Sequence, residues 1–189
     1  MGTLFNRAIQ YAVDAHANQL RKGTNIPYIV HPMEAAAIVA AMTQDEEILA
    51  AAVLHDVIED TNRTRQDIER EFGETVAAYV ASESENKREN LPAAETWQLR
   101  KQETLDRLSD ASEPIQMIAL GDKLSNLRAI HRDFTMLGDQ FWQRFTVSDP
   151  SMQAWYYLSL VKCLERLQKY PVYQEFAELA QKVFGRFKA

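Results

Sequence analysis

The residues best suited to chemistry lie around a histidine–aspartate pair. His55 and Asp56 directly follow the apolar run 50–54, and Glu59 and Asp60 come one helical turn later. At about 100° per residue, these four polar side chains share one side of a helix. Burying carboxylates beside an imidazole is costly unless a cation compensates. The pattern favours a metal site, although a helix that emerges into solvent with a frayed acidic end would show the same residues.

Two distant residues extend this set. Asp122 follows an apolar stretch of a predicted helix, and His31 precedes Pro32, a residue type favoured at the first helical position. Taken alone, Asp122 also suits a salt bridge and His31 a capping role. Combined with His55 and Asp56, they offer two imidazoles and two carboxylates, a set suited to a divalent first-row transition metal.

Such a set predicts a division of labour. Four protein ligands would leave an octahedral ion two open positions, one for an attacking water and one for a substrate phosphate oxygen. Glu59 and Asp60 would then orient and deprotonate the water or protonate the leaving oxygen.

The elements that must position these residues are predicted to be helices throughout. Apolar residues recur at three- and four-residue spacing, with only 6 glycines and 6 prolines, and no stretch reads convincingly as a strand. The predicted helices cover residues 4–21, 31–42, 45–60, 64–72, 74–81, 94–108, 114–130, 134–145, 150–170 and 171–187. Residues 22–28 are predicted to form a loop, and the polar segment 82–93 a long functional or mobile loop.

Composition limits the class of protein. The 189 residues, 46% hydrophobic and 25% charged, predict one all-α domain over 1–189, with a motif-bearing core at about 4–130 and C-terminal helices at about 134–187. A net charge of −6 disfavours a nucleic-acid partner. No targeting segment or membrane span is recognisable. The single cysteine, Cys163, leaves the reducing cytoplasm as the simplest compartment. Oligomeric state cannot be predicted.

In sequence order, these motifs resemble the HD hydrolase domain of RelA/SpoT homologues, and most of all the stand-alone, MESH-type small alarmone hydrolases. The likeness spans about residues 4–130. It runs through Ala15-His16, Gln19, Arg21-Lys22, Pro27-Tyr28-Ile29, His31-Pro32, Leu54 to Thr61, Phe72-Gly73 and Asp122 to Leu127. An HD pair alone is weak evidence, but the ordered set is specific. It implies an all-helical orthogonal bundle of the HD phosphohydrolase type.

The resemblance also implies roles for individual residues. The residues that match the family's manganese ligands are His31, His55, Asp56 and Asp122. Glu59 and Asp60 match the pair that activates water to release pyrophosphate from the ribose 3′ position. The residues that match or lie near nucleotide contacts are Arg21, Lys22, Asn126 and one of Tyr156 and Tyr157, of which Tyr157 is preferred. Core packing is the alternative for this tyrosine pair.

Three departures from the family bear on these expectations. The chain has no room for the nucleotidyltransferase domain of long members, so synthesis is not expected. Residues 80–87 differ from the usual Val-Thr-Lys pattern, which leaves Lys87, Arg100 and Lys101 either as phosphate contacts or as solvated surface charges. Gly121 stands where alanine is usual, which predicts looser packing of the helix that carries Asp122.

The sequence therefore leads to a Mn²⁺-dependent 3′-pyrophosphohydrolase that converts (p)ppGpp to GDP or GTP plus pyrophosphate. Two alternatives stay open. One is a related phosphohydrolase of ppApp or of the 2′-phosphate of NADPH, and the other is a non-catalytic nucleotide-sensing module on an HD scaffold.

Overall fold

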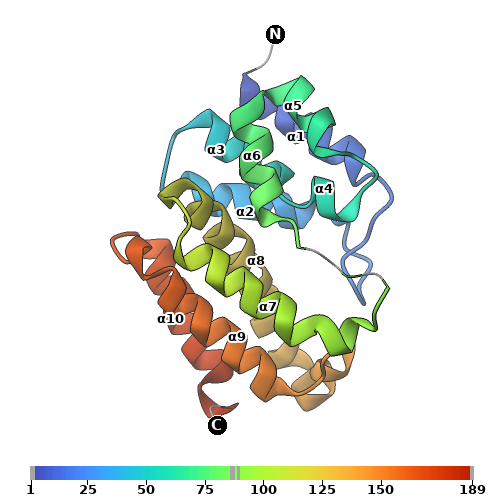
Figure 1. Cartoon of the computed structure of the whole chain (residues 1–189). Helices are drawn as coiled ribbons and strands as arrows, with labels where there is room; N and C mark the ends of the chain where they lie inside the picture. Colours follow the sequence, from blue (N-terminus) through green and yellow to red (C-terminus); the bar gives the residue numbers. More distant parts are fainter. Residues whose placement is uncertain (1–2, 86–87, 89, 188–189) are drawn as a thin grey trace. The chain divides into compact units, whose positions relative to one another are not determined.

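The computed structural model describes residues 3–85, 88 and 90–187, which fall into two compact units (Figure 1). The first unit, residues 3–84 and 113–125, contains α1 (Leu4–Ala15), α2 (Val30–Ala40), α3 (Glu46–Leu54), α4 (Val57–Asp60), α5 (Arg65–Phe72) and α6 (Glu74–Glu83). The second unit contains α7 (Ala93–Ser109), η1 (Gly138–Arg144), α9 (Pro150–Cys163), η2 (Glu165–Leu167), α10 (Pro171–Phe184) and η3 (Gly185–Phe187). Helix α8 (Glu113–Leu137) begins in the first unit and continues in the second.

The all-α prediction is confirmed. Within the described residues there is no strand, only an isolated bridge between Leu20 and Pro27. None of the described helices combines the length and the hydropathy needed to cross a membrane. The expectation of one domain over the whole chain stays a prediction.

Helix α3 forms the centre of the first unit. It packs against α1, α2 and α6, and its small residues Ala50, Ala51 and Ala52 are completely buried. Asp45 caps its first turn by accepting hydrogen bonds from the amides of Glu47 and Ile48. The apolar run 50–54 thus lies in a buried helix of this unit.

The predicted helix 45–60 is nevertheless wrong in one respect, because it is broken at the histidine–aspartate pair. Helix α3 ends at Leu54, α4 begins at Val57, and His55 and Asp56 lie between them. His55 Nδ1 lies 2.8 Å from the Ala52 carbonyl oxygen, the acceptor that a continuing helix would offer to the Asp56 amide. The imidazole of His55 thus takes the place of the Asp56 amide as hydrogen-bond partner of this carbonyl, at the point where the helix ends. The prediction that all four polar residues lie on one continuous helix is therefore wrong.

The first helix is also shorter than predicted, because the chain folds back on itself after Ala15. Residues 19–28 form a loop in which the Arg21 amide donates to the Ile26 carbonyl and the Tyr28 amide to the Gln19 carbonyl. Gly23, with φ 73°, allows the reversal. The predicted loop 22–28 is confirmed but begins several residues earlier.

Differences in the second unit concern helix ends. Helix α8 reaches Leu137 instead of residue 130, and Gly138, with φ 59°, ends it. The predicted helix 134–145 is therefore the last turn of α8 followed by η1. The helices predicted to reach residues 170 and 187 end at Cys163 and Phe184, before the short turns η2 and η3.

Candidate metal centre and acidic pair

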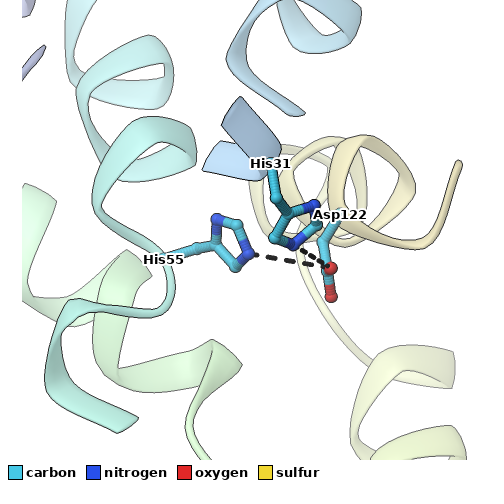
Figure 2. Close-up of side chains that lie close together, drawn as sticks. All are labelled: His31, His55 and Asp122. Atoms are coloured by element: carbon cyan, nitrogen blue, oxygen red, sulfur yellow. Dashed lines mark ion pairs between the residues drawn. The ribbon is translucent and has the colours of Figure 1, made fainter. Parts of the chain in front are cut away.

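Three buried side chains of the first unit converge on one point. His31 Nε2 lies 3.1 Å from Asp122 Oδ1, and His55 Nε2 lies 3.7 Å from the same oxygen. Their donor atoms all lie within 4.8 Å of one another. Figure 2 shows the two imidazoles, from α2 and from the end of α3, turned toward the carboxylate on α8. Residues far apart in the sequence thus form a group that could hold a metal ion.

Asp56, the fourth predicted ligand, stands beside this group. Its Oδ2 lies 3.0 Å from His55 Nε2 and 3.5 Å from His31 Nε2. The same oxygen accepts a hydrogen bond of 2.7 Å from the Tyr28 hydroxyl. The structure therefore brings all four predicted ligands together, with Asp56 shared between the two imidazoles and a phenol.

The electrostatics of the group favour a cation. Burial alone would raise the pKa of Asp56, but the charge of His55 and the close contacts with both imidazoles hold it well below its usual range. Burial would also raise the pKa of Asp122, but Lys123 above all, together with the two imidazoles, holds it well below its usual range. Burial lowers the pKa of His55, yet the two carboxylates outweigh burial and raise it well above its ordinary value. Both carboxylates are therefore kept as anions beside the imidazoles.

The donor set fits a divalent transition metal. His55 Nε2 is buried, and no acceptor among the described residues is aligned to hydrogen-bond with it. Ligands about 2.1 Å from one ion lie about 3–3.4 Å apart, close to the separations seen between these donors. Two imidazole nitrogens with carboxylate oxygens are a suitable set for such an ion.

Gly121 allows the helices of two predicted ligands to pack closely. A Cβ at this position would lie 2.7 Å from the Ala35 carbonyl oxygen and 2.7 Å from Val39 Cγ2, both on α2. The expectation that this glycine loosens the packing is wrong, because the missing side chain lets α8 approach α2 closely. The close approach brings the helix of Asp122 to the helix of His31.

Tyr28 links the metal group to the predicted acidic pair, and sequence reasoning assigned it no role. Its hydroxyl donates to Asp56 Oδ2 at 2.7 Å and to Asp60 Oδ2 at 2.9 Å. Burial first, and then the charges of these two carboxylates, raise the pKa of Tyr28, so the phenol keeps its proton and remains a donor. Its place within Pro27-Tyr28-Ile29, just before His31, was the only signal in the sequence.

The acidic pair sits on the short helix α4. The main-chain oxygen of Asp60 accepts a hydrogen bond of 2.7 Å from the Gln19 side-chain amide. The other side-chain atom of that amide, Gln19 Oε1, lies 2.7 Å from Nδ1 of the buried His16. Glu59 lies on the same helix and is half-buried. Asp60 is thus held through both its side chain and its main chain.

The predicted nucleotide contacts in the first unit lie in the loop before α2. The Arg21 guanidinium lies over the Tyr28 ring, 5.6 Å from its centroid, and Lys22 is exposed. This places Arg21 next to the residue that contacts both Asp56 and Asp60. Lys87 lies outside the described residues.

The second unit holds the other predicted contacts. Tyr157 is buried and stacks on Phe184 at a centroid distance of 5.0 Å, an arrangement typical of core packing. Asn126 is half-buried on α8. Glu85 binds the two basic candidates of this unit, with Arg100 Nη1 at 2.9 Å and Lys101 Nζ at 2.6 Å.

Comparison with known proteins shows the family of the chain. A family model described as HD domain matches residues 8–140. The chain belongs to the HD domain family. This HD-domain chain is 35% identical over 127 residues to the guanosine-3′,5′-bis(diphosphate) 3′-pyrophosphohydrolase MESH1 of Danio rerio, covering 66% of this chain and 67% of that protein. It is 34% identical over 127 residues to the GTP pyrophosphokinase rsh of Brucella ovis, of whose length it spans 17%.

A solved structure resembles this HD-domain chain over most of its length. It belongs to a metazoan ortholog of SpoT that hydrolyses ppGpp and plays a role in starvation responses. The TM-score is 0.75 at 26% identity, and the match covers 96% of each chain.

Proposed function

We propose that this protein is a Mn²⁺-dependent 3′-pyrophosphohydrolase of (p)ppGpp. The observation that carries the proposal is the buried convergence of His31, His55 and Asp122, with Tyr28 joining this group to Asp60. The similarity of this chain to MESH1 and to the SpoT ortholog supports ppGpp as the substrate.

The four ligands of the metal would be His31, His55, Asp56 and Asp122. When bound, Mn²⁺ supplies Lewis-acid stabilisation of the phosphate charge and lowers the pKa of water. The mixed set of imidazole nitrogens and carboxylate oxygens suits a divalent first-row ion, and Mn²⁺ is the proposed one because the family resemblance implies it.

Glu59 and Asp60 would manage the protons of the reaction. One carboxylate takes a proton from the attacking water, whose oxygen forms a bond to the phosphorus attached to the ribose 3′-oxygen. The bond between that phosphorus and the 3′-oxygen breaks, and the 3′-oxygen takes up a proton. One water and one ppGpp thus give one GDP and one pyrophosphate. Tyr28 would keep the Asp60 carboxylate oriented through its 2.9 Å hydrogen bond.

The substrate would be held by positive charge near the site. Arg21 and Lys22 are proposed phosphate or nucleotide contacts, and Asn126 and Tyr157 remain proposals carried by the family resemblance. The proposed partner is a small nucleotide rather than a nucleic acid, in keeping with the net charge of −6. With Cys163 as the single cysteine, we place the activity in the cytoplasm.

The proposed bond cleavage is tested by running the reaction in ¹⁸O-labelled water. Metal-loaded protein should convert ppGpp to GDP and pyrophosphate, with one ¹⁸O in the pyrophosphate and none in the GDP. Label in the GDP, or release of inorganic phosphate in place of pyrophosphate, would overturn the proposed reaction. The His55→Ala variant, which lacks one proposed ligand, serves as the control and should be inactive.

A further inference from the structure

The second ring nitrogen of His31 is held by a chain of two side chains. Nδ1, the ring nitrogen of His31 that has no dashed line in Figure 2, lies 2.8 Å from the hydroxyl oxygen of Ser125 on α8. The same hydroxyl donates to Glu34 Oε2 on α2, also at 2.8 Å. Both His31 and Ser125 are buried, at 3% and 2% exposure, so water does not readily replace either contact.

The number of available protons fixes the direction of these hydrogen bonds. A serine hydroxyl has one proton, and an ionised carboxylate only accepts. Since the Ser125 proton goes to Glu34, the Ser125 oxygen must accept from His31 Nδ1–H. In the neutral imidazole, the lone pair of His31 is then on Nε2, the atom that faces Asp122 at 3.1 Å.

His55 shows the same arrangement with a different partner. Its Nδ1 lies 2.8 Å from the main-chain oxygen of Ala52, which can only accept, so Nδ1 carries the proton there too. Both imidazoles therefore present Nε2 to the same place. For His55 the backbone fixes the ring, whereas for His31 two replaceable side chains do so.

We propose that Ser125 and Glu34 are positioning residues that fix the orientation and the Nδ1–H tautomer of His31 for metal binding. This inference rests on the proposed metal site. Partners that orient a metal-binding imidazole typically change metal affinity by about 10- to 100-fold when they are removed. Glu34 acts through Ser125, so its contribution depends on the serine hydroxyl.

The test measures Mn²⁺ affinity of the purified full chain by calorimetry against a competing chelator. Ser125→Ala should weaken Mn²⁺ binding by about 10- to 100-fold, while Ser125→Thr, which keeps the hydroxyl, should restore most of it. Thr135→Ala is the matched control. It removes a hydroxyl from the same helix, where Thr135 donates to the His131 carbonyl at 2.7 Å, and it should leave the affinity unchanged.

A double-mutant cycle tests whether Glu34 acts through Ser125 or independently of it. We call the first arrangement, Glu34 to Ser125 to His31, the relay. Glu34→Ala should weaken Mn²⁺ binding in the parent protein but add nothing in the Ser125→Ala background. Additive losses, or a Ser125→Ala affinity within twofold of the parent, would overturn the relay. Thermal unfolding of the metal-free variants identifies any that fail to fold, and Ser125→Thr then decides the outcome.

Failure of the relay and failure of the hydrolase proposal give different results. Unchanged Mn²⁺ affinity in Ser125→Ala, with ppGpp hydrolysis intact in the parent, would remove the relay alone. Tight Mn²⁺ binding that is weakened in Ser125→Ala, without any ppGpp hydrolysis, would keep the relay and remove the proposed substrate. A parent protein that binds no Mn²⁺ would overturn the metal site and the relay together.

Discussion

Tyr28 shows at the residue scale how one hydroxyl group can connect a proposed metal ligand, Asp56, to a proposed catalytic carboxylate, Asp60. Its proton is shared between Asp56 Oδ2 and Asp60 Oδ2, at 2.7 and 2.9 Å. A hydrogen bond to a charged group contributes about 1.5–3 kcal/mol. The hydroxyl therefore limits the orientations open to both carboxylates without contributing a ligand of its own.

Replacing this tyrosine should affect turnover more than metal binding. We expect Tyr28→Phe to lower kcat by about 10- to 100-fold, because Asp60 loses the bond that orients it. Mn²⁺ affinity should not weaken, since Asp56 Oδ2 loses a competing donor. Steady-state kinetics and Mn²⁺ titration of the same preparation check both points. A variant with normal kcat and weaker Mn²⁺ binding would contradict the assigned role.

A substitution of Glu59 distinguishes a hydrolase from a non-catalytic nucleotide sensor with the same fold. Glu59→Gln should retain Mn²⁺ binding and lower ppGpp turnover by about 100- to 10,000-fold, the range for loss of a general acid or base. Pyrophosphate release and calorimetric Mn²⁺ binding measure the two effects. Unimpaired turnover would remove Glu59 from the proposed chemistry.

At the scale of elements, the site depends on two local features that are unfavourable in isolation. Helix α3 stops at Leu54, which places His55 and Asp56 in the short connection to α4. Gly121 lies inside a helix, where glycine costs about 1 kcal/mol relative to alanine. Both features bring metal-site residues from separate helices within a few ångströms of one another.

Gly121→Ala should therefore destabilise the protein despite the better helix propensity of alanine. The added Cβ would meet the Ala35 carbonyl oxygen and Val39 Cγ2 at 2.7 Å, and such overpacking costs about 1–3 kcal/mol. We expect a lower free energy of unfolding and weaker Mn²⁺ binding, because α2 and α8 must separate. Chemical denaturation of the metal-free protein measures the first effect.

A second substitution serves as the internal control for this prediction. Adding Val39→Ala should relieve the side-chain contact but not the contact with the Ala35 backbone, so recovery should be partial. A Gly121→Ala protein that is more stable than the parent would show that the two helices are free to adjust.

The capping box at the start of α5 should make the stability of the fold depend on pH. Thr64 and Asp67 form a capping box, and the Thr64 amide, the Thr64 hydroxyl and Arg70 lower the pKa of Asp67 to about 2. Because the folded-state pKa lies below the unfolded value of about 4, the Asp67 charge stabilises the fold above about pH 4 and this contribution is lost as the pH falls toward 2.

Asp67→Ala should accordingly lower the urea midpoint at pH 7. The difference from the parent protein should shrink as the pH falls below about 4. Urea unfolding followed by circular dichroism at several pH values is the appropriate measurement. A difference independent of pH would mean that the carboxylate charge plays no part.

At the scale of the whole molecule, the sequence predicted the helical class and most helix starts. Pro150 and Pro171 begin α9 and α10, and Gly73, with φ 90°, separates α5 from α6 as expected. Helix ends were less predictable because individual side-chain contacts with the main chain help to set them, as where the His55 ring meets the Ala52 carbonyl. The spacing of apolar residues predicts where helices lie, but it does not predict a contact between a polar side chain and the main chain.

The proposed metal ligands could be singled out in the sequence for a reason that does not apply to their hydrogen-bond partners. His31, His55, Asp56 and Asp122 carry side chains whose burial needs a cation, so their types alone raise the question. Tyr28, Ser125 and Glu34 are ordinary residues whose importance comes from partners 28 to 94 positions away. Only the three-dimensional structure brings such pairs together.

The most direct test of the account is pyrophosphate release from ppGpp by metal-free protein, measured before and after Mn²⁺ is added. Parallel reactions contain ppApp and NADPH. We predict no release without metal, rapid release from ppGpp with Mn²⁺, and no release with the His55→Ala variant. Folded, Mn²⁺-loaded protein that leaves ppGpp intact would contradict the account, and turnover of ppApp or NADPH alone would assign the site to that substrate.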